Sequence, residues 1–338
     1  MNERDASAGR RNSAENLNGV LNFLKPPGMT SFDAVAWARR AFNVKKAGHC
    51  GTLDPDAAGV LPICVGASTK LCGLLTGARK SYRVEAVAGL LTDTLDISGA
   101  VVDRRAETLP ERRAFESILS DFTGRIEQIP PMYSAVKIGG EALYKMARRG
   151  EEAVRAPRAV EIYAAGIVFY GGDRVIFDVT CSKGAYVRSL CRDIGEKAGI
   201  YLCMSFLLRT GAAGLKIEDS KTVSDVAGRV SAGGTGELLI PADALLPDYP
   251  RVDLPDGLYG AFMNGAPVAL GHAQARAALQ PGYEAFSQTN GTGLSASPDE
   301  AIYRVYYDGR FLGIGALAAD SSGAASLRVK KFLIDRGG

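Results

Sequence analysis

A short loop in the first quarter of the chain carries the side chains best suited to chemistry. Residues 48–59 read GHCGTLDPDAAG and hold two carboxylates, Asp54 and Asp56, with one of the two histidines of the chain. Pro55 biases Asp54 toward an extended conformation, and the glycines allow backbone conformations closed to other residues. The apolar run that follows predicts a buried strand, so we expect Asp54 where a loop meets rigid scaffold. A turn capped by Asp54 is the ordinary alternative for an isolated Asp-Pro pair.

Several motifs extend this first one along the chain. The string G-H-x-G-T-L-D-P-x-A-x-G-V-L at residues 48–61 resembles the catalytic motif of the TruB family of tRNA pseudouridine synthases, which act at position 55 in the TΨC arm. Further segments resemble motifs of the same family in the same order, at residues 25–31, 80–84, 92–96, 129–137 and 181–190. The departures are Ala185, where the family commonly has Thr, and Leu208, which puts one RNA-contacting Arg in doubt.

The resemblance implies a reaction and the residues that carry it. Pseudouridine forms when the C1′–N1 bond of uridine breaks, the uracil rotates, and C1′ joins C5, which needs no cofactor. Asp54 would act as nucleophile or stabilise positive charge on the sugar. Arg188 would pair with Asp54, and Tyr82 would pack on the target base and move a proton. The residues leave open whether attack is at C1′, at the base, or by elimination.

Other residues are assigned to substrate binding by the same resemblance. His49 would enter the space vacated by the flipped nucleotide, since extruding a stacked base costs a few kcal/mol that other contacts must offset. Tyr186 and Leu207 would line the base pocket. Lys25 and Lys70 would hold nearby phosphates or the motif loop itself.

The hydrophobic patterns predict a mixed α/β chain. They indicate strands at residues 19–24, 60–66, 82–90, 159–170 and 175–181, and helices at residues 31–42 and 187–198. Ser31 is expected to cap the first helix. The resemblance implies the pseudouridine synthase fold, in which a bent mixed sheet forms an RNA-binding cleft.

Residues 122–157 combine positive charge with aromatic side chains. A charged run is usually a solvated helix face, but Tyr133 and Tyr144 lie among these cations. Because cations hold phosphates and aromatic rings stack on bases, the pattern favours a nucleic-acid surface. The resemblance implies an RNA-binding thumb, whose expected cations are Lys137, Lys145, Arg148 and Arg149.

Domain boundaries follow from shifts in composition. Residues 1–18 are polar and predict a disordered tail, or alternatively a basic arm on RNA. Prolines clustered from residue 241 to residue 255 divide a catalytic domain at 19–248 from a β-rich, PUA-like RNA-binding domain at 249–338. Within that domain a hairpin is expected around Asp308-Gly309, and residues 271–300 indicate an insertion or surface loop.

Composition limits the remaining classes of function. The 338 residues carry 40 basic and 37 acidic side chains, a net charge of +3, so any RNA-binding surface must be local. The six cysteines lack C-x-x-C and zinc-type spacing, which indicates reduced thiols and no metal site. No run approaches the roughly 20 apolar residues of a membrane span. We therefore expect a cytoplasmic, monomeric enzyme whose partner is the tRNA TΨC stem-loop, with no membrane contact.

Two other classes of function fit part of the same pattern. A non-catalytic RNA-binding protein would explain the thumb and the C-terminal module but not Asp54, Tyr82 and Arg188. A metal-dependent hydrolase would use His49, Asp54 and Asp56, although these three do not form a complete ligand set.

Overall fold

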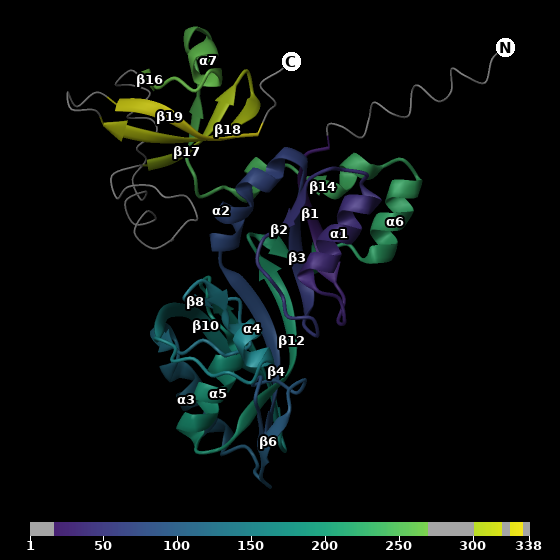
Figure 1. The fold of residues 1–338 in the computed structure, drawn as a ribbon, viewed down its shortest axis with the longest axis vertical. Coiled ribbons are helices and arrows are strands. Elements are labelled where there is room, and N and C mark those ends of the chain that lie inside the picture. Colours follow the sequence, from purple (N-terminus) through teal and green to yellow (C-terminus); the bar gives the residue numbers. More distant parts are fainter. Residues whose placement is uncertain (1–16, 270–300, 320–324, 334–338) are drawn as a thin grey trace, which may run out of the picture.

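The computed structural model of the chain describes residues 17–269, 301–319 and 325–333. It contains one large and one small β-sheet with helices packed around them (Figure 1). Of the tail expected at residues 1–18, residues 1–16 lie outside the described residues, as does the insertion expected at residues 271–300.

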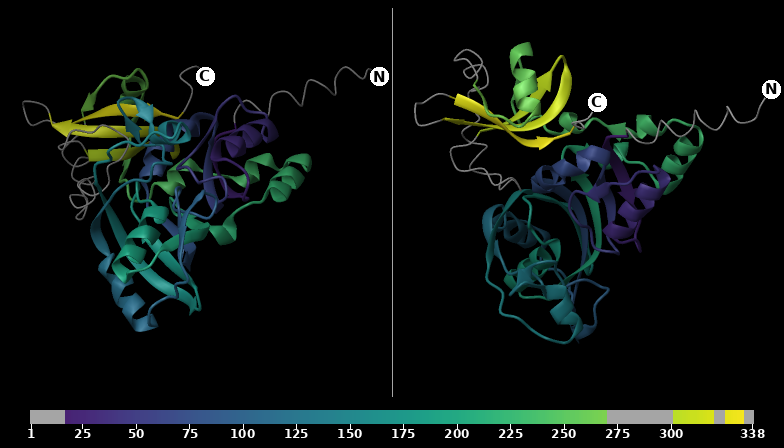
Figure 2. Two further views of the ribbon diagram at one scale, coloured as in Figure 1. Left: turned by 60° about the horizontal axis from the view of Figure 1, so that its bottom comes forward. Right: turned by 45° about the horizontal axis from the view of Figure 1, so that its top comes forward.

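The large sheet has ten strands and is mixed. Its main path runs β14-β1-β3-β12-β4-β11-β10-β7, with β2 beside β3 and β13 beside β12. The pairing of β3 with β12 is parallel and the other pairings are antiparallel. The long strands curve strongly (Figure 2). The strands are β1 (Gly19–Lys25), β2 (Ala47–His49), β3 (Ala58–Val65), β4 (Lys80–Ala88), β7 (Gly124–Gln128), β10 (Arg158–Gly171), β11 (Arg174–Cys181), β12 (Leu202–Ala212), β13 (Leu215–Lys216) and β14 (Leu239–Ile240).

The small sheet is built from the C-terminal part of the chain. Its order is β15-β17-β18-β19-β16, and helix α7 (Asp256–Met263) lies against it (Figure 1). The predicted hairpin is confirmed, because Asp308 and Gly309 join two paired strands and both have positive φ, 47° and 70°. The strands are β15 (Arg251–Asp253), β16 (Val268–Ala269), β17 (Ala301–Tyr307), β18 (Arg310–Ala319) and β19 (Ala325–Phe332).

Two further strand pairs and six helices complete the larger part. The pairs are β5 (Leu90–Thr92) with β6 (Val101–Arg104), and β8 (Lys137–Ile138) with β9 (Glu141–Ala142). The helices are α1 (Ser31–Ala41), α2 (Cys72–Gly77), α3 (Arg112–Asp121), α4 (Leu143–Arg148), α5 (Val187–Ala198) and α6 (Val223–Ser231). The bounds predicted for α5 are confirmed, and those for α1 to within one residue.

The predicted cap of α1 was wrong by one residue. Thr30 is the N-cap, because its hydroxyl accepts a hydrogen bond from the Asp33 backbone while the Asp33 side chain accepts one from the Thr30 backbone. Ser31 instead exchanges hydrogen bonds with the backbone of Leu53, accepting from its N–H at 2.8 Å and donating to its carbonyl at 3.1 Å. The start of α1 therefore fastens the loop that carries Asp54.

A shared apolar core joins the two sheets. Val20 and Leu74 of the larger part belong to the same buried cluster as Ile302, Ile314 and Leu333 of the small sheet. In Figure 1 the small sheet lies next to α2. The chain passes from one sheet to the other between the end of β14 and the start of β15. Among the described residues, no helix is long and apolar enough to span a bilayer.

Candidate active site

Asp54 lies in the loop between β2 and β3, where buried polar groups hold the backbone. Besides Ser31, one of these groups is Lys25 at the end of β1, which is fully buried. Its ammonium donates to three carbonyl oxygens, of Pro26 at 2.8 Å, Met29 at 2.6 Å and Pro55 at 2.9 Å. Burial lowers the pKa of Lys25 to about 8. Because all three protons are engaged, these contacts favour the loop-holding role over phosphate binding.

Arg209 is a second buried cation under the loop, and the sequence analysis assigned it no role. Its guanidinium donates to the carbonyls of Val60 at 2.6 Å, Thr52 at 3.3 Å and Gly51 at 3.1 Å. The available signal was that Arg209 is the only charged residue in strand β12. Gly59 lets the backbone of Arg209 lie close to β3, since a Cβ at residue 59 would lie 2.2 Å from the Arg209 carbonyl oxygen.

Arg188 positions the carboxylate of Asp54. Its Nε lies 3.1 Å from Asp54 Oδ2, and its Nη2 donates to Asp54 Oδ1 at 3.3 Å, so the contact is two-pronged. The remaining donors reach the carbonyls of Thr94 and Tyr133, each at 3.0 Å. The side chain of Arg188 is 6% exposed and that of Asp54 40%. The buried guanidinium of Arg188 therefore holds the partly exposed carboxylate of Asp54 in place.

Asp96 is a third charge beside this pair, and its side chain was not predicted as part of the site. Its Oδ2 lies 3.7 Å from Arg188 Nε. Burial raises the pKa of Asp54, Arg188 opposes this rise, and the charge of Asp96 adds to it. The net direction is upward, so Asp54 binds a proton more readily than a solvated Asp.

Two cavities meet at Asp54. One, of about 610 Å³, extends toward Asp96, and the other, of about 490 Å³, extends toward Tyr82 and Tyr186. Arg188 lines both cavities, as does Leu207. The structure therefore brings together five of the residues expected at the site, which are Asp54, Tyr82, Arg188, Tyr186 and Leu207.

The environment of Tyr82 restricts its chemistry. Burial raises the pKa of Tyr82 to about 12. Arg209 lies opposite Tyr82 where β4 pairs with β12, and the positive charge of its guanidinium acts to lower the pKa of Tyr82. The phenol is therefore protonated near neutral pH. It can donate a hydrogen bond or a proton, but it does not begin as a base.

We predict that Tyr82→Phe slows chemistry more than it weakens binding. The change removes only the hydroxyl, so the single-turnover rate should fall by about tenfold to a hundredfold, while the Kd for tRNA stays within about twofold. Tyr163→Phe is the matched control, because Tyr163 is a part-buried Tyr on a strand of the same sheet that lines neither cavity. A loss of affinity at an unchanged single-turnover rate would assign Tyr82 to RNA binding alone.

His49 and Lys70 lie away from the two cavities. His49 is half-buried on β2, its Nδ1 is buried without a hydrogen-bond partner, and burial lowers its pKa. Lys70 is exposed in the turn after β3. Neither side chain lines the cavities at Asp54, so their assignment to substrate contacts stays a prediction.

The expected thumb forms the segment around β8, β9 and α4. Arg148 lines both cavities, with its guanidinium carbon 5.6 Å from the centre of the Tyr144 ring. Lys137 and Lys145 are exposed. Arg149 is also exposed, but it forms ion pairs with two glutamates of the same segment, Glu141 at 2.6 Å and Glu151 at 2.8 Å. Arg148 therefore has the position best suited to substrate, and the pairing makes Arg149 less available.

Groups suited to holding a metal lie elsewhere in the described part of the chain. His49, Asp54 and Asp56 do not converge on one point there, which removes the basis for a hydrolase built on them. Cys50, Cys64 and Cys72 do converge, a cluster that their spacing in the sequence did not reveal.

Comparisons with known proteins agree with this geometry. Residues 39–187 match the family model described as TruB family pseudouridylate synthase, N-terminal domain. tRNA pseudouridine synthase B of Alkaliphilus oremlandii is 44% identical over 249 residues, which cover 74% of this chain and 82% of the relative. The protein of the same name from Clostridium kluyveri is 39% identical over 300 residues, which cover 88% and 95%.

Solved structures share the fold at lower identity. A Cbf5-Nop10-Gar1 complex matches with a TM-score of 0.69 at 24% identity, covering 95% of this chain and 87% of that one. An H/ACA ribonucleoprotein bound to a substrate RNA containing 2'-deoxyuridine matches with a TM-score of 0.67 at 22% identity, covering 96% and 87%. The predicted mixed pseudouridine synthase fold, with its PUA-like C-terminal sheet, is thereby confirmed. The chain belongs to the TruB family of pseudouridylate synthases.

Proposed function

We propose that the protein isomerises uridine to pseudouridine at position 55 of tRNA, in the TΨC loop, with Asp54 as the essential carboxylate. The observation that carries this proposal is the Asp54–Arg188 pair, which lies where two cavities meet. The relatives named tRNA pseudouridine synthase B support tRNA as the substrate. The family resemblance supports action as a monomer, and a tRNA substrate favours a cytoplasmic enzyme.

The reaction asks little of the protein beyond a charged carboxylate and a fixed geometry. The C1′–N1 bond breaks, C1′ joins C5, the proton at C5 is released and N1 gains one, so atoms and charge balance. In this scheme Asp54 acts as nucleophile or as the counter-charge to the sugar, and Arg188 keeps it ionised despite its burial. The phenol of Tyr82 is placed to donate to the base. No step needs a metal or a redox partner.

The substrate uridine must leave its stack to reach Asp54. The cavity lined by Tyr82 and Tyr186 has aromatic and apolar walls suited to a flat base. Arg148 at its rim is suited to a phosphate beside the flipped nucleotide. We therefore propose that the segment around α4 binds the stem-loop and that the second cavity receives the base.

Tritium release distinguishes this function from its rivals. Wild-type protein mixed with tRNA transcript carrying tritium at C5 of uridine should release about one equivalent per tRNA, and a transcript with cytidine at position 55 should release none. A non-catalytic RNA-binding protein would bind both transcripts without release. Release from the second transcript at the same level would move the target to another uridine.

The thumb assignment predicts a change in salt dependence. Reversing charge at Lys145 and Arg148 should weaken tRNA binding and flatten its dependence on salt, because each lost phosphate contact removes roughly 0.7 to 0.9 from the slope of log affinity against log salt. The single-turnover rate at saturating enzyme should change much less for Lys145 than for Arg148, since only Arg148 lines the cavities.

The matched control reverses two exposed cations elsewhere, Arg113 on α3 and Lys221 before α6. Affinity for a TΨC stem-loop is measured at several salt concentrations for all variants. An unchanged slope for the Lys145 and Arg148 variants, or an equal change in the control, would remove these residues from the RNA-binding surface.

A further inference from the structure

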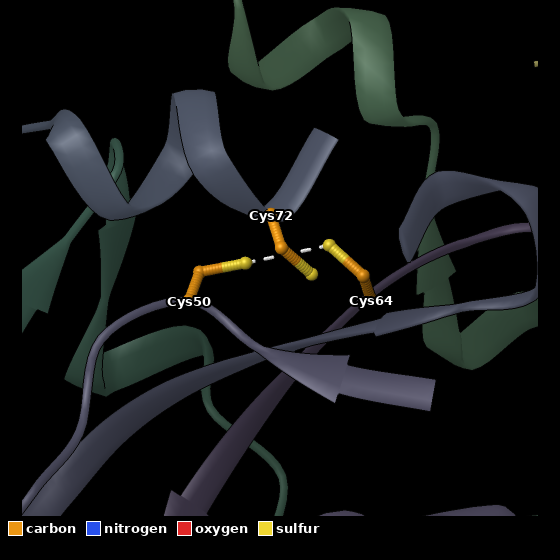
Figure 3. A group of neighbouring side chains, drawn as sticks. All are labelled: Cys50, Cys64 and Cys72. Atoms are coloured by element: carbon orange, nitrogen blue, oxygen red, sulfur yellow. Dashed lines mark hydrogen bonds between the residues drawn. The ribbon is translucent and has the colours of Figure 1, made fainter. Parts of the chain in front are cut away.

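Three cysteines meet beneath the loop that carries Asp54. Cys50 follows β2, Cys64 lies in β3, and Cys72 begins α2 (Figure 3). Their sulfur atoms all lie within 4.8 Å of one another, and those of Cys50 and Cys64 are 3.4 Å apart. The first two side chains are fully buried and the third is half-buried, so Cys72 is the most accessible of the three.

The surroundings of the cluster differ from those of an ordinary buried thiol. A Cβ at Gly48 would lie 3.2 Å from Cys72 Sγ, so the glycine leaves the room in which that thiol sits. In the described part of the chain this is the one group of three or more His, Cys, Asp or Glu side chains whose ligand atoms converge.

We propose that Cys50, Cys64 and Cys72 form a thiolate site for a zinc ion, with the fourth position left to water. A zinc–sulfur distance of about 2.3 Å in tetrahedral geometry places sulfur atoms about 3.8 Å apart. The Cys50 and Cys64 sulfurs, 3.4 Å apart, would separate by about 0.4 Å, and since all three sulfurs lie within 4.8 Å of one another, no pair has to close by more than about 1 Å. Soft thiolate ligands favour zinc over magnesium or calcium, which prefer oxygen.

The role of such a site is structural. The ion would tie the base of the Asp54 loop to β3 and α2, three elements otherwise joined by backbone pairing and apolar packing. None of the three cysteines lines the cavities at Asp54, so the metal would not take part in the isomerisation. Binding should stabilise the folded chain, because the assembled ligands exist only in the folded state.

Cobalt serves as a spectroscopic probe for the site. Full-length protein, purified without a polyhistidine tag and reduced with a phosphine, is titrated with Co²⁺ and then with Zn²⁺. Wild-type protein should develop a thiolate-to-cobalt charge-transfer band at one equivalent, and Zn²⁺ should abolish it. Cys50→Ser, Cys64→Ser and Cys72→Ser should each weaken Co²⁺ binding at least roughly a hundredfold. Cys191→Ala, equally buried in another core cluster, should behave like wild type.

Two further measurements test whether zinc stabilises the protein and whether the variants are folded. Zn²⁺ should raise the Tm of wild-type protein and of Cys191→Ala by about 5 °C but leave that of Cys72→Ser unchanged. Far-UV circular dichroism identifies folded variants. Cys72→Ser is expected to disturb the fold least, because Cys72 is half-buried whereas Cys50 and Cys64 are fully buried. Absence of the charge-transfer band in wild-type protein, or its survival in the folded Cys72→Ser variant, would overturn the proposal. Neither outcome affects the tritium assay, which tests the isomerisation separately.

Discussion

Asp54→Asn is expected to lower the turnover of uridine to pseudouridine by at least about a thousandfold while leaving tRNA affinity within a few-fold. The amide matches the carboxylate in shape and can still lie beside Arg188. It lacks the negative charge that acts on the sugar or base. Because most of the binding surface lies elsewhere, along both cavities and the segment around α4, the complex should still form.

Single-turnover tritium release and filter binding measure the two quantities separately. Asp173→Asn is the control, since Asp173 is an exposed carboxylate that lines neither cavity. It should retain near wild-type turnover. Tritium release by Asp54→Asn at a rate near that of wild type would show that another group performs the chemistry.

Arg188→Gln should have the second largest effect, about a hundredfold at pH 7. Burial already raises the pKa of Asp54, and Arg188 opposes that rise. Removing the guanidinium leaves Asp54 and Asp96 together without their shared cation, so the pKa of Asp54 should rise further. Because the ionised form is the active one, the acidic limb of the rate profile should move to higher pH, and activity should partly recover as the pH rises.

The measurement is the single-turnover rate from about pH 5 to pH 9. Arg188→Lys keeps the charge but loses the forked contacts, so it should restore the position of the acidic limb more than the rate itself. Arg192→Gln on the same helix is the control, because Arg192 pairs with Asp193 and Glu196 rather than with Asp54. A profile for Arg188→Gln with the wild-type acidic limb would limit Arg188 to a structural role.

The features that the sequence predicted correctly are those with local signals. The apolar run after Gly59 predicted β3, the spacing of apolar and charged residues predicted α5, and the Asp308-Gly309 pair predicted a hairpin. The sequence of the motif loop predicted that Asp54 lies in a loop beside a strand, because glycines and proline restrict the backbone within a few residues of themselves.

The features that sequence did not reveal depend on partners far apart in the chain. Arg209 supports a loop some 150 residues earlier through backbone carbonyls, which every residue type possesses. The cap of α1 was misplaced because Ser31, a good cap by type, was engaged by Leu53 instead. The three cysteines of the proposed zinc site come together only after β2, β3 and α2 have packed.

The apolar core shared by the two sheets bears on how the protein is made. Val20 and Cys50 near the start of the chain pack in one cluster with Ile314 and Leu333 near its end. The ribosome synthesises the chain from the N-terminus, so Val20 and Cys50 lack these packing partners until the strands of the small sheet have emerged. The apolar packing beneath the Asp54 loop is therefore completed only after the small sheet has been synthesised, and a nascent chain that still lacks this sheet exposes apolar surface to chaperones.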